Sequence, residues 1–127
     1  MDAVRALWSS SRSEHAVTPD REEAVRRLID HAPGSLLVAE QDGEVVGALI
    51  AAWDGWRGGM YRLAVRPDRR RLGIGRLLLE AGEAHLRARG APRVTALVAF
   101  EDARARAFWV ALGYAVDEDV GRLVRSL

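Results

Sequence analysis

Arginine and glycine are concentrated in one stretch, residues 63–76, which reads Leu-Ala-Val-Arg-Pro-Asp-Arg-Arg-Arg-Leu-Gly-Ile-Gly-Arg. An apolar run typical of a strand leads into a basic loop with two glycines, and the loop leads into a helix. The first N–H groups of a helix lack partners within the helix and lie at the positive end of its dipole. Glycines let the backbone approach a phosphate closely, and arginines add charge-assisted hydrogen bonds. These residues predict an anion site that would fit a diphosphate.

Two other phosphate-binding patterns do not fit this stretch. A dinucleotide fingerprint needs a third glycine where Leu78 stands. A P-loop needs a lysine, and all nineteen basic residues of this chain are arginines. A glycine turn with a solvated basic face is the alternative that the loop by itself leaves open.

Composition excludes several classes of function. The chain has no cysteine, which excludes thiolate catalysis, and its three histidines lie far apart, so no metal site is expected. A net charge of +1 argues against a general nucleic-acid binder. No apolar run approaches the ~20 residues that cross a membrane, and no apolar leader is present, so we expect a cytoplasmic protein. A length of 127 residues fits one domain, 1–127.

The elements that position this loop follow from apolar spacing and turn residues. Helices are predicted at 2–10, from a Thr18 cap to about 30, at 75–89 and at 103–112. Strands are predicted at 36–40, 45–53, 60–65 and 94–100, with two closing strands at 114–116 and 121–127 around an acidic turn. Asp42-Gly43 predicts a tight hairpin between the first two strands. The order predicts a mixed sheet with helices on its faces.

Two blocks of the sequence resemble the GCN5-related N-acetyltransferases (GNAT). Their acetyl-CoA loop, Arg/Gln-x-x-Gly-x-Gly/Ala after Val-x-Pro, matches Arg70-Arg71-Leu72-Gly73-Ile74-Gly75 after Val65-Arg66-Pro67. Their second block, Asn-x-x-Ala-x-x-x-Tyr-x-x-x-Gly-Phe, is similar to residues 102–114, Asp-Ala-Arg-Ala-Arg-Ala-Phe-Trp-Val-Ala-Leu-Gly-Tyr. The resemblance covers about 36–127 and implies an α/β (α+β) fold with a mostly antiparallel central sheet and helices on both faces. The family usually begins with a strand, whereas this chain opens in a helix, so either the fold lacks that strand or the natural start lies upstream.

The resemblance also implies a cosubstrate and a reaction. Acetyl-CoA would donate its acetyl group to an amine that attacks the thioester directly, with the oxyanion stabilised by a backbone N–H. The backbone of Leu63, Ala64 and Val65 would bind the pantetheine arm and the acetyl carbonyl. The pyrophosphate would be held by the backbone from Arg71 to Arg76, that is Arg71, Leu72, Gly73, Ile74, Gly75 and Arg76. Arg70 would support the loop, Arg69 or Arg71 could reach phosphate, and Asp102 and Trp109 occupy family positions beside the cofactor.

Two residues depart from the family pattern. Trp109 stands where relatives carry the tyrosine that protonates the leaving thiolate, and an indole N–H has no useful acidity. Trp109 is therefore predicted to pack in the core, and Tyr114 and Tyr61 are the candidates to replace the acid. Asp102 replaces the usual asparagine, and we expect it to cap the helix that starts at Ala103.

The general base is open on the sequence. Glu40, Asp54 and Glu101 are the carboxylates that could face an acceptor, and Asp54 and Glu101 rank first because they end strands on either side of the cofactor strand. Tyr61 could instead hold a water that carries the proton. An α-amino group, with a pKa of ~7.7–8.0, needs a base less than a lysine amine at ~10.4. We therefore expect a low-pKa acceptor, either a small-molecule amine or a peptide N-terminus.

Two other function classes remain as alternatives. A catalytically silent acyl-CoA-binding module would keep the loop and lack turnover. An RNA-binding module is less consistent, because the arginines cluster where cofactor phosphates would lie and aromatic residues do not alternate with them. A homodimer is an expectation from the resemblance alone.

Overall fold

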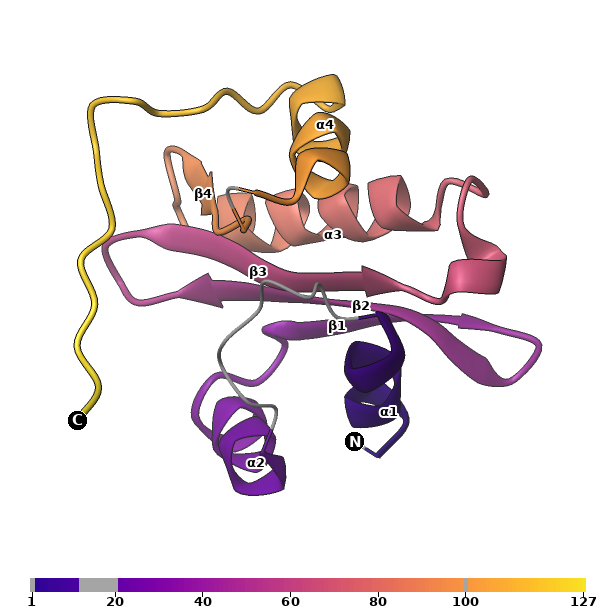
Figure 1. Ribbon diagram of the computed structural model, residues 1–127. Coiled ribbons are helices and arrows are strands. Elements are labelled where there is room, and N and C mark those ends of the chain that lie inside the picture. Colours follow the sequence, from indigo (N-terminus) through magenta and orange to yellow (C-terminus); the bar gives the residue numbers. More distant parts are fainter. Residues whose placement is uncertain (1, 12–20, 100) are drawn as a thin grey trace.

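The computed structural model describes residues 2–11, 21–99 and 101–127. One four-stranded sheet has helices on both faces (Figure 1). The strands, in their spatial order, are β1 Leu36–Gln41, β2 Glu44–Trp53, β3 Gly58–Val65 and β4 Val94–Ala96. The helices are α1 Asp2–Ser11, α2 Glu22–His31, α3 Ile74–Ala88 and α4 Ala103–Ala111, with a 3₁₀ turn, η1, at Pro67–Arg69. The predicted fold class is confirmed.

The first three strands form an antiparallel meander. The β1–β2 turn has φ values of 54° at Asp42 and 78° at Gly43. Positive φ at both central residues matches the twist of a hairpin, which is why the Asp-Gly pair predicted this turn correctly.

The sheet buries apolar side chains on both faces because β2 is apolar along its length. Ala48 and Ile50 lie against α1 and α2, and Leu49 and Ala51 lie against α3 and α4. Each face therefore has its own cluster, and β2 and β3 contribute to both. The strand that carries the predicted cofactor contacts is thus held from both sides.

The fourth strand is short and parallel to β3. It pairs only through Gly58–Val94, Gly59–Thr95 and Met60–Ala96. The prediction of a strand over 94–100 holds for 94–96, and residues 97–99 leave the ladder. Phe100 lies outside the described residues.

The two predicted closing strands are wrong. Residues 112–127 form neither helix nor strand, although the acidic turn is present, with the Asp119 N–H donating to Asp117 Oδ1 at 3.1 Å. Alternating residues fit a strand, but a strand also needs hydrogen bonds to a neighbouring backbone, and in the part of the chain that the structure describes this stretch forms no such ladder.

The amino-terminal part agrees with the prediction in outline. Within the described residues the first strand is β1, and α2 begins at Glu22 with Arg21 as a cap residue that makes no side-chain cap. The predicted cap at Thr18 lies outside the described residues. No helix in the described ranges is both long and apolar enough to span a membrane.

Candidate active site

The site begins where β3 loses its neighbour. The β3–β4 ladder ends with the Leu97 N–H donating to the Met60 carbonyl at 3.1 Å. Beyond it, β3 continues to Val65, and among the described residues this part of β3 pairs only with β2. The Arg66 N–H donates to Val46 on β2, and alternate residues of a strand point to opposite sides. The N–H groups of Leu63 and Val65 therefore face the open side, whereas Ala64 directs its backbone to β2.

A bulge at Arg62 sets the direction of these donors. Arg62 has a φ of 58°, and the β2–β3 register shifts between Ala48 and Ile50. The Trp8 indole N–H donates to the Arg62 carbonyl at 2.9 Å, and the guanidinium lies 6.0 Å from the Trp8 ring centroid. α1, which packs on one face of the sheet, thus stabilises the bulge through a side-chain hydrogen bond. Sequence reasoning missed this contact, and the only signal was the place of Trp8 on the apolar stripe of α1.

The basic loop, residues 66–73, turns from β3 into α3. Arg71 and Gly73 have φ values of 66° and 80°, and Gly73 precedes the helix without a side-chain cap. The first helical bond runs from the Leu77 N–H to the Gly73 carbonyl. The N–H groups at the start of α3, residues 74–76, consequently have no acceptor within the helix. These N–H groups point out of the helix start, as the predicted anion site requires, and the binding itself stays a prediction.

The loop arginines divide into two groups. Arg66 donates to both Asp68 oxygens and to Glu44, each at 2.7 Å, and Asp68 also pairs with Arg69. The Arg66 guanidinium lowers the pKa of Asp68 to about 2. These ion pairs brace the start of the loop. Arg71, in contrast, is exposed and forms no ion pair within the described ranges.

The second block lies against the loop. Partial burial and the nearby Arg104 lower the pKa of Arg70, and Asp102 opposes that shift. A Cβ on Gly75 would lie 3.0 Å from Phe108 Cζ, so this glycine lets α4 approach the start of α3 closely. The two motifs that resemble the family are therefore adjacent in space.

Asp102 and Trp109 have structural roles. Asp102 Oδ1 accepts from the Ala105 N–H at 3.0 Å, which confirms the predicted helix cap. Trp109 is 6% exposed and packs edge-on against Phe108 and Tyr114. The expectation that Trp109 packs in the core is confirmed.

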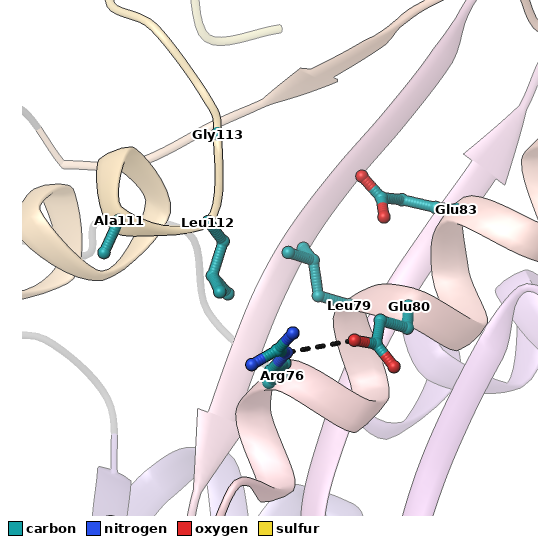
Figure 2. Close-up of a pocket in the computed structure, with 7 residues that line it drawn as sticks. All are labelled: Arg76, Leu79, Glu80, Glu83, Ala111, Leu112 and Gly113. Carbon is teal, nitrogen blue, oxygen red and sulfur yellow. Dashed lines mark hydrogen bonds and ion pairs between the residues drawn. The ribbon is translucent and has the colours of Figure 1, made fainter.

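Tyr114 forms its hydrogen bond to the middle of α3 and not to the basic loop. Its hydroxyl donates to Glu83 Oε2 at 2.9 Å, and burial together with Glu83 raises the pKa of Tyr114. Glu83 also lines a hollow of about 420 Å³ between α3 and the end of α4, where Figure 2 shows it with Arg76, Leu79, Glu80, Ala111, Leu112 and Gly113. A raised pKa makes this phenol a weaker acid than a free tyrosine.

The structure separates the other predicted catalytic residues. Asp54 lies in the β2–β3 turn, at the end of β3 opposite the loop. Its carboxylate accepts from the N–H groups of Arg57 at 2.6 Å and Trp56 at 2.7 Å, which lower the pKa of Asp54. The distance from the loop and the lowered pKa both argue against Asp54 as the base.

Three further residues carry groups that could transfer a proton. Glu101 is exposed just before α4, and Glu40 is exposed on β1, separated from β3 by β2. Tyr61 is half-buried where the open side of β3 begins, and it packs against the cluster under α1 and α2. Tyr61 lies on β3 and Glu101 follows the segment that leaves β4, so these two residues belong to the stretches on either side of the point where β3 and β4 separate.

Comparisons agree with this arrangement. The model of the Acetyltransferase (GNAT) family matches residues 1–114. Acetyltransferase SG1711 of Sodalis glossinidius (strain morsitans) is 37% identical over 108 residues, 85% of this chain and 76% of that protein. The fold is similar to Ard1 from Thermoplasma volcanium, with a TM-score of 0.77 and 19% identity over 91% of this chain and 78% of that one. It is also similar to Chaetomium thermophilum Naa20 in complex with a bisubstrate analogue, with a TM-score of 0.74 and 24% identity over 87% of this chain and 66% of that one.

Proposed function

Because the chain belongs to the acetyltransferase (GNAT) family, we propose that it transfers an acetyl group from acetyl-CoA to an amine. One observation carries the proposal. The unpaired side of β3 at Leu63 and Val65 runs directly into a loop and helix start whose N–H groups lack internal acceptors. A single stretch of backbone thus offers donors first for an extended amide-bearing arm and then for a diphosphate.

The same backbone accounts for the chemistry. The amine nitrogen forms a bond to the acetyl carbon, the carbon–sulfur bond breaks, and the CoA thiolate leaves while the amine loses a proton. An N–H at Leu63 or Val65 would stabilise the charge that develops on the carbonyl oxygen. A thiol has a pKa near ~8.5, so a thiolate can leave near neutral pH without a strong acid. Trp109 and Tyr114 need not donate a proton in this scheme.

The acceptor we propose is an amine of low pKa, either a small molecule or a peptide N-terminus. Such an amine is partly neutral near pH 8 and needs little help from a base. The proton that the amine loses would pass either to a water molecule bound by Tyr61 or to the carboxylate of Glu101. A cytoplasmic location, where we expect both substrates, stays a prediction.

The first test is thermal unfolding with acetyl-CoA, with ATP as a control anion. At 100 times the Kd, mass action adds about 2.7 kcal/mol. For a domain of this size the melting temperature should rise by about 8–15 °C. A similar shift with ATP, or none with acetyl-CoA, would contradict the proposed cosubstrate.

The second test is turnover of amines, measured as CoA thiol released and acetylated product formed. A pH profile of kcat/KM that rises with the amine's own pKa would support a low-pKa acceptor. A profile that follows an enzyme carboxylate would contradict it. Binding of acetyl-CoA without turnover of any amine would favour the silent binding module, which the buried Trp109 keeps as a second candidate.

A further inference from the structure

The side chain of Trp109 is buried, and its indole N–H has no acceptor among the described residues. Trp109 is 6% exposed and lies among the rings and aliphatic side chains under α3 and α4. In residues 2–11, 21–99 and 101–127, its side chain makes ring contacts and no hydrogen bond. A buried donor without a partner costs about as much free energy as a lost hydrogen bond, and such groups are rare in folded proteins. The unpaired N–H therefore calls for a functional explanation.

The aromatic rings beside Trp109 do not replace an acceptor. The ring centroids of Phe108 and Tyr114 lie 6.0 Å and 4.9 Å from that of Trp109, and both contacts are edge-on. The face of a ring accepts from an N–H only weakly compared with an oxygen. The Tyr114 hydroxyl is directed to Glu83, to which it donates at 2.9 Å. These contacts orient the indole and leave its N–H for another partner.

The cluster around Trp109 extends to the point where β3 and β4 separate. Leu63 of β3 and Val98, just beyond β4, both pack against this cluster. Phe108, the neighbour of Trp109 in α4, lies at the start of α3, where a Cβ on Gly75 would be 3.0 Å from Phe108 Cζ. The cluster that contains the unpaired N–H thus borders both the open side of β3 and the helix start proposed to bind the diphosphate.

We propose that the indole N–H of Trp109 donates a hydrogen bond to the pantetheine arm of acetyl-CoA. This inference rests on the proposed function, because that arm is the part of the ligand that would lie along β3. The arm carries amide carbonyls separated by apolar carbons. Sites for such ligands are mostly apolar with a few placed polar groups, and an apolar cluster with one unpaired donor has that character. Binding supplies the acceptor that the described residues do not.

The role of Trp109 is to bind the arm and not to transfer a proton. An indole N–H has no useful acidity, so it keeps its proton throughout the reaction. A hydrogen bond to a part of the ligand that does not react has the same strength before and in the transition state. Its loss therefore raises KM for acetyl-CoA and leaves kcat unchanged, whereas the loss of a proton donor lowers kcat.

The first test follows the indole protons of the full isotope-labelled chain by nuclear magnetic resonance as acetyl-CoA is added. The chain has four tryptophans, and contacts with the Phe108 and Tyr114 rings identify the signal of Trp109. We expect the Trp109 indole proton to move downfield as it gains an acceptor, and the Trp53 indole proton to stay in place. If the backbone signals of β3 and of the start of α3 move while the Trp109 indole proton does not, this inference is wrong and the proposed function stands. If no signal moves, both are wrong.

The second test removes the donor and keeps an aromatic ring. In Trp109→Phe, the Kd for acetyl-CoA by titration calorimetry and the KM should both rise about three- to tenfold, with kcat changed less than about twofold. Trp53→Phe makes the same change at a half-buried residue packed against the same cluster, and it should bind acetyl-CoA normally. An equal rise of Kd in both variants would mean that packing alone accounts for the loss. A fall of kcat without a rise of Kd would mean proton transfer, and either result overturns the proposal.

Discussion

Gly73 sits where backbone strain and the proposed phosphate contacts coincide. Its φ of 80° suits glycine, and no described residue lies within 4 Å of the position that a Cβ would occupy. Arg71, two residues earlier, also has a positive φ, at 66°. Turns of this kind can point N–H groups toward one concave site, which is why this loop suits the proposed diphosphate.

Gly73→Ala should cost about 1–2 kcal/mol of stability, because an L-residue is strained at this φ. It should also weaken acetyl-CoA binding about tenfold or more, measured by titration calorimetry, because relief of the strained φ would shift the N–H groups that we propose bind the diphosphate. Gly43→Ala is the matched control, with a φ of 78° and open space around it in the β1–β2 turn. It should lose similar stability and bind normally, and equal binding by both variants would contradict the assigned loop.

For single residues, the sequence predicted the structural role correctly where the interacting partner is near in the chain. Asp102 caps a helix three residues away, and Trp109 lies on the apolar stripe of its own helix, so local spacing was enough. The bond from Tyr114 to Glu83 and the bond from Trp8 to Arg62 join residues far apart in sequence. Only the packing of helices on the sheet brings them together, and no local pattern reports it.

At the scale of elements, α1 and the start of the basic loop both act on β3. α1 reaches the bulge through Trp8, and the ion pairs of Arg66 tie the loop to Glu44 at the start of β2. The open side of β3 is thus fixed at its middle and at its end.

Trp8→Phe should destabilise the protein by about 1–3 kcal/mol, because the partly buried Arg62 carbonyl loses its donor. It should also lower kcat/KM, since the bulge would no longer aim the Leu63 N–H. Trp53→Phe is the control. It makes the same change from an indole to a phenyl ring at a half-buried residue on the other face of the sheet. Equal kinetic losses in the two variants would mean that Trp8 serves packing only.

The ion pairs of the loop predict a pH dependence. Because the folded-state pKa of Asp68 is lowered, to about 2, its contribution is present above the ordinary pKa of 3.8 and is lost as the pH falls toward 2. In Asp68→Asn the free energy of unfolding should therefore fall less between about pH 4 and pH 2 than it does in the natural chain. Urea unfolding at each pH measures this difference. Glu23→Gln, on the exposed face of α2, controls for the change in net charge. An unaltered acid profile in Asp68→Asn would show that the pair contributes nothing.

Elements with local signals were predicted closely, and those that depend on a distant partner were not. The Asp42-Gly43 turn and the helices have signals within their own residues. The stretch 121–127 has the alternation of a strand but pairs with no strand among the described residues, so the pattern alone gave a wrong result.

For the whole molecule, the two apolar clusters share one sheet. Leu49 and Ile50 are neighbours on β2 yet belong to different clusters. Strain or loss of packing on one face is therefore transmitted to the other through the same backbone.

Leu49→Ala and Ile50→Ala should each cost about 2–5 kcal/mol. Both variants should unfold in one transition at a lower urea concentration. The transition followed by tryptophan fluorescence should coincide with the one followed by circular dichroism. Gly121→Ala, in open space on the C-terminal segment, should leave the transition in place. Two separate transitions in either core variant would contradict a shared sheet.

The parallel pairing of β4 also bears on the order in which the protein folds. The β1–β2–β3 meander needs only contacts between neighbours in the chain, whereas β4 must return across the whole of α3 to reach β3. Pairings that close long loops form slowly, and during synthesis they must wait for the later residues to emerge. A nascent chain should therefore build the meander first and become able to bind the proposed cosubstrate only at the end of folding.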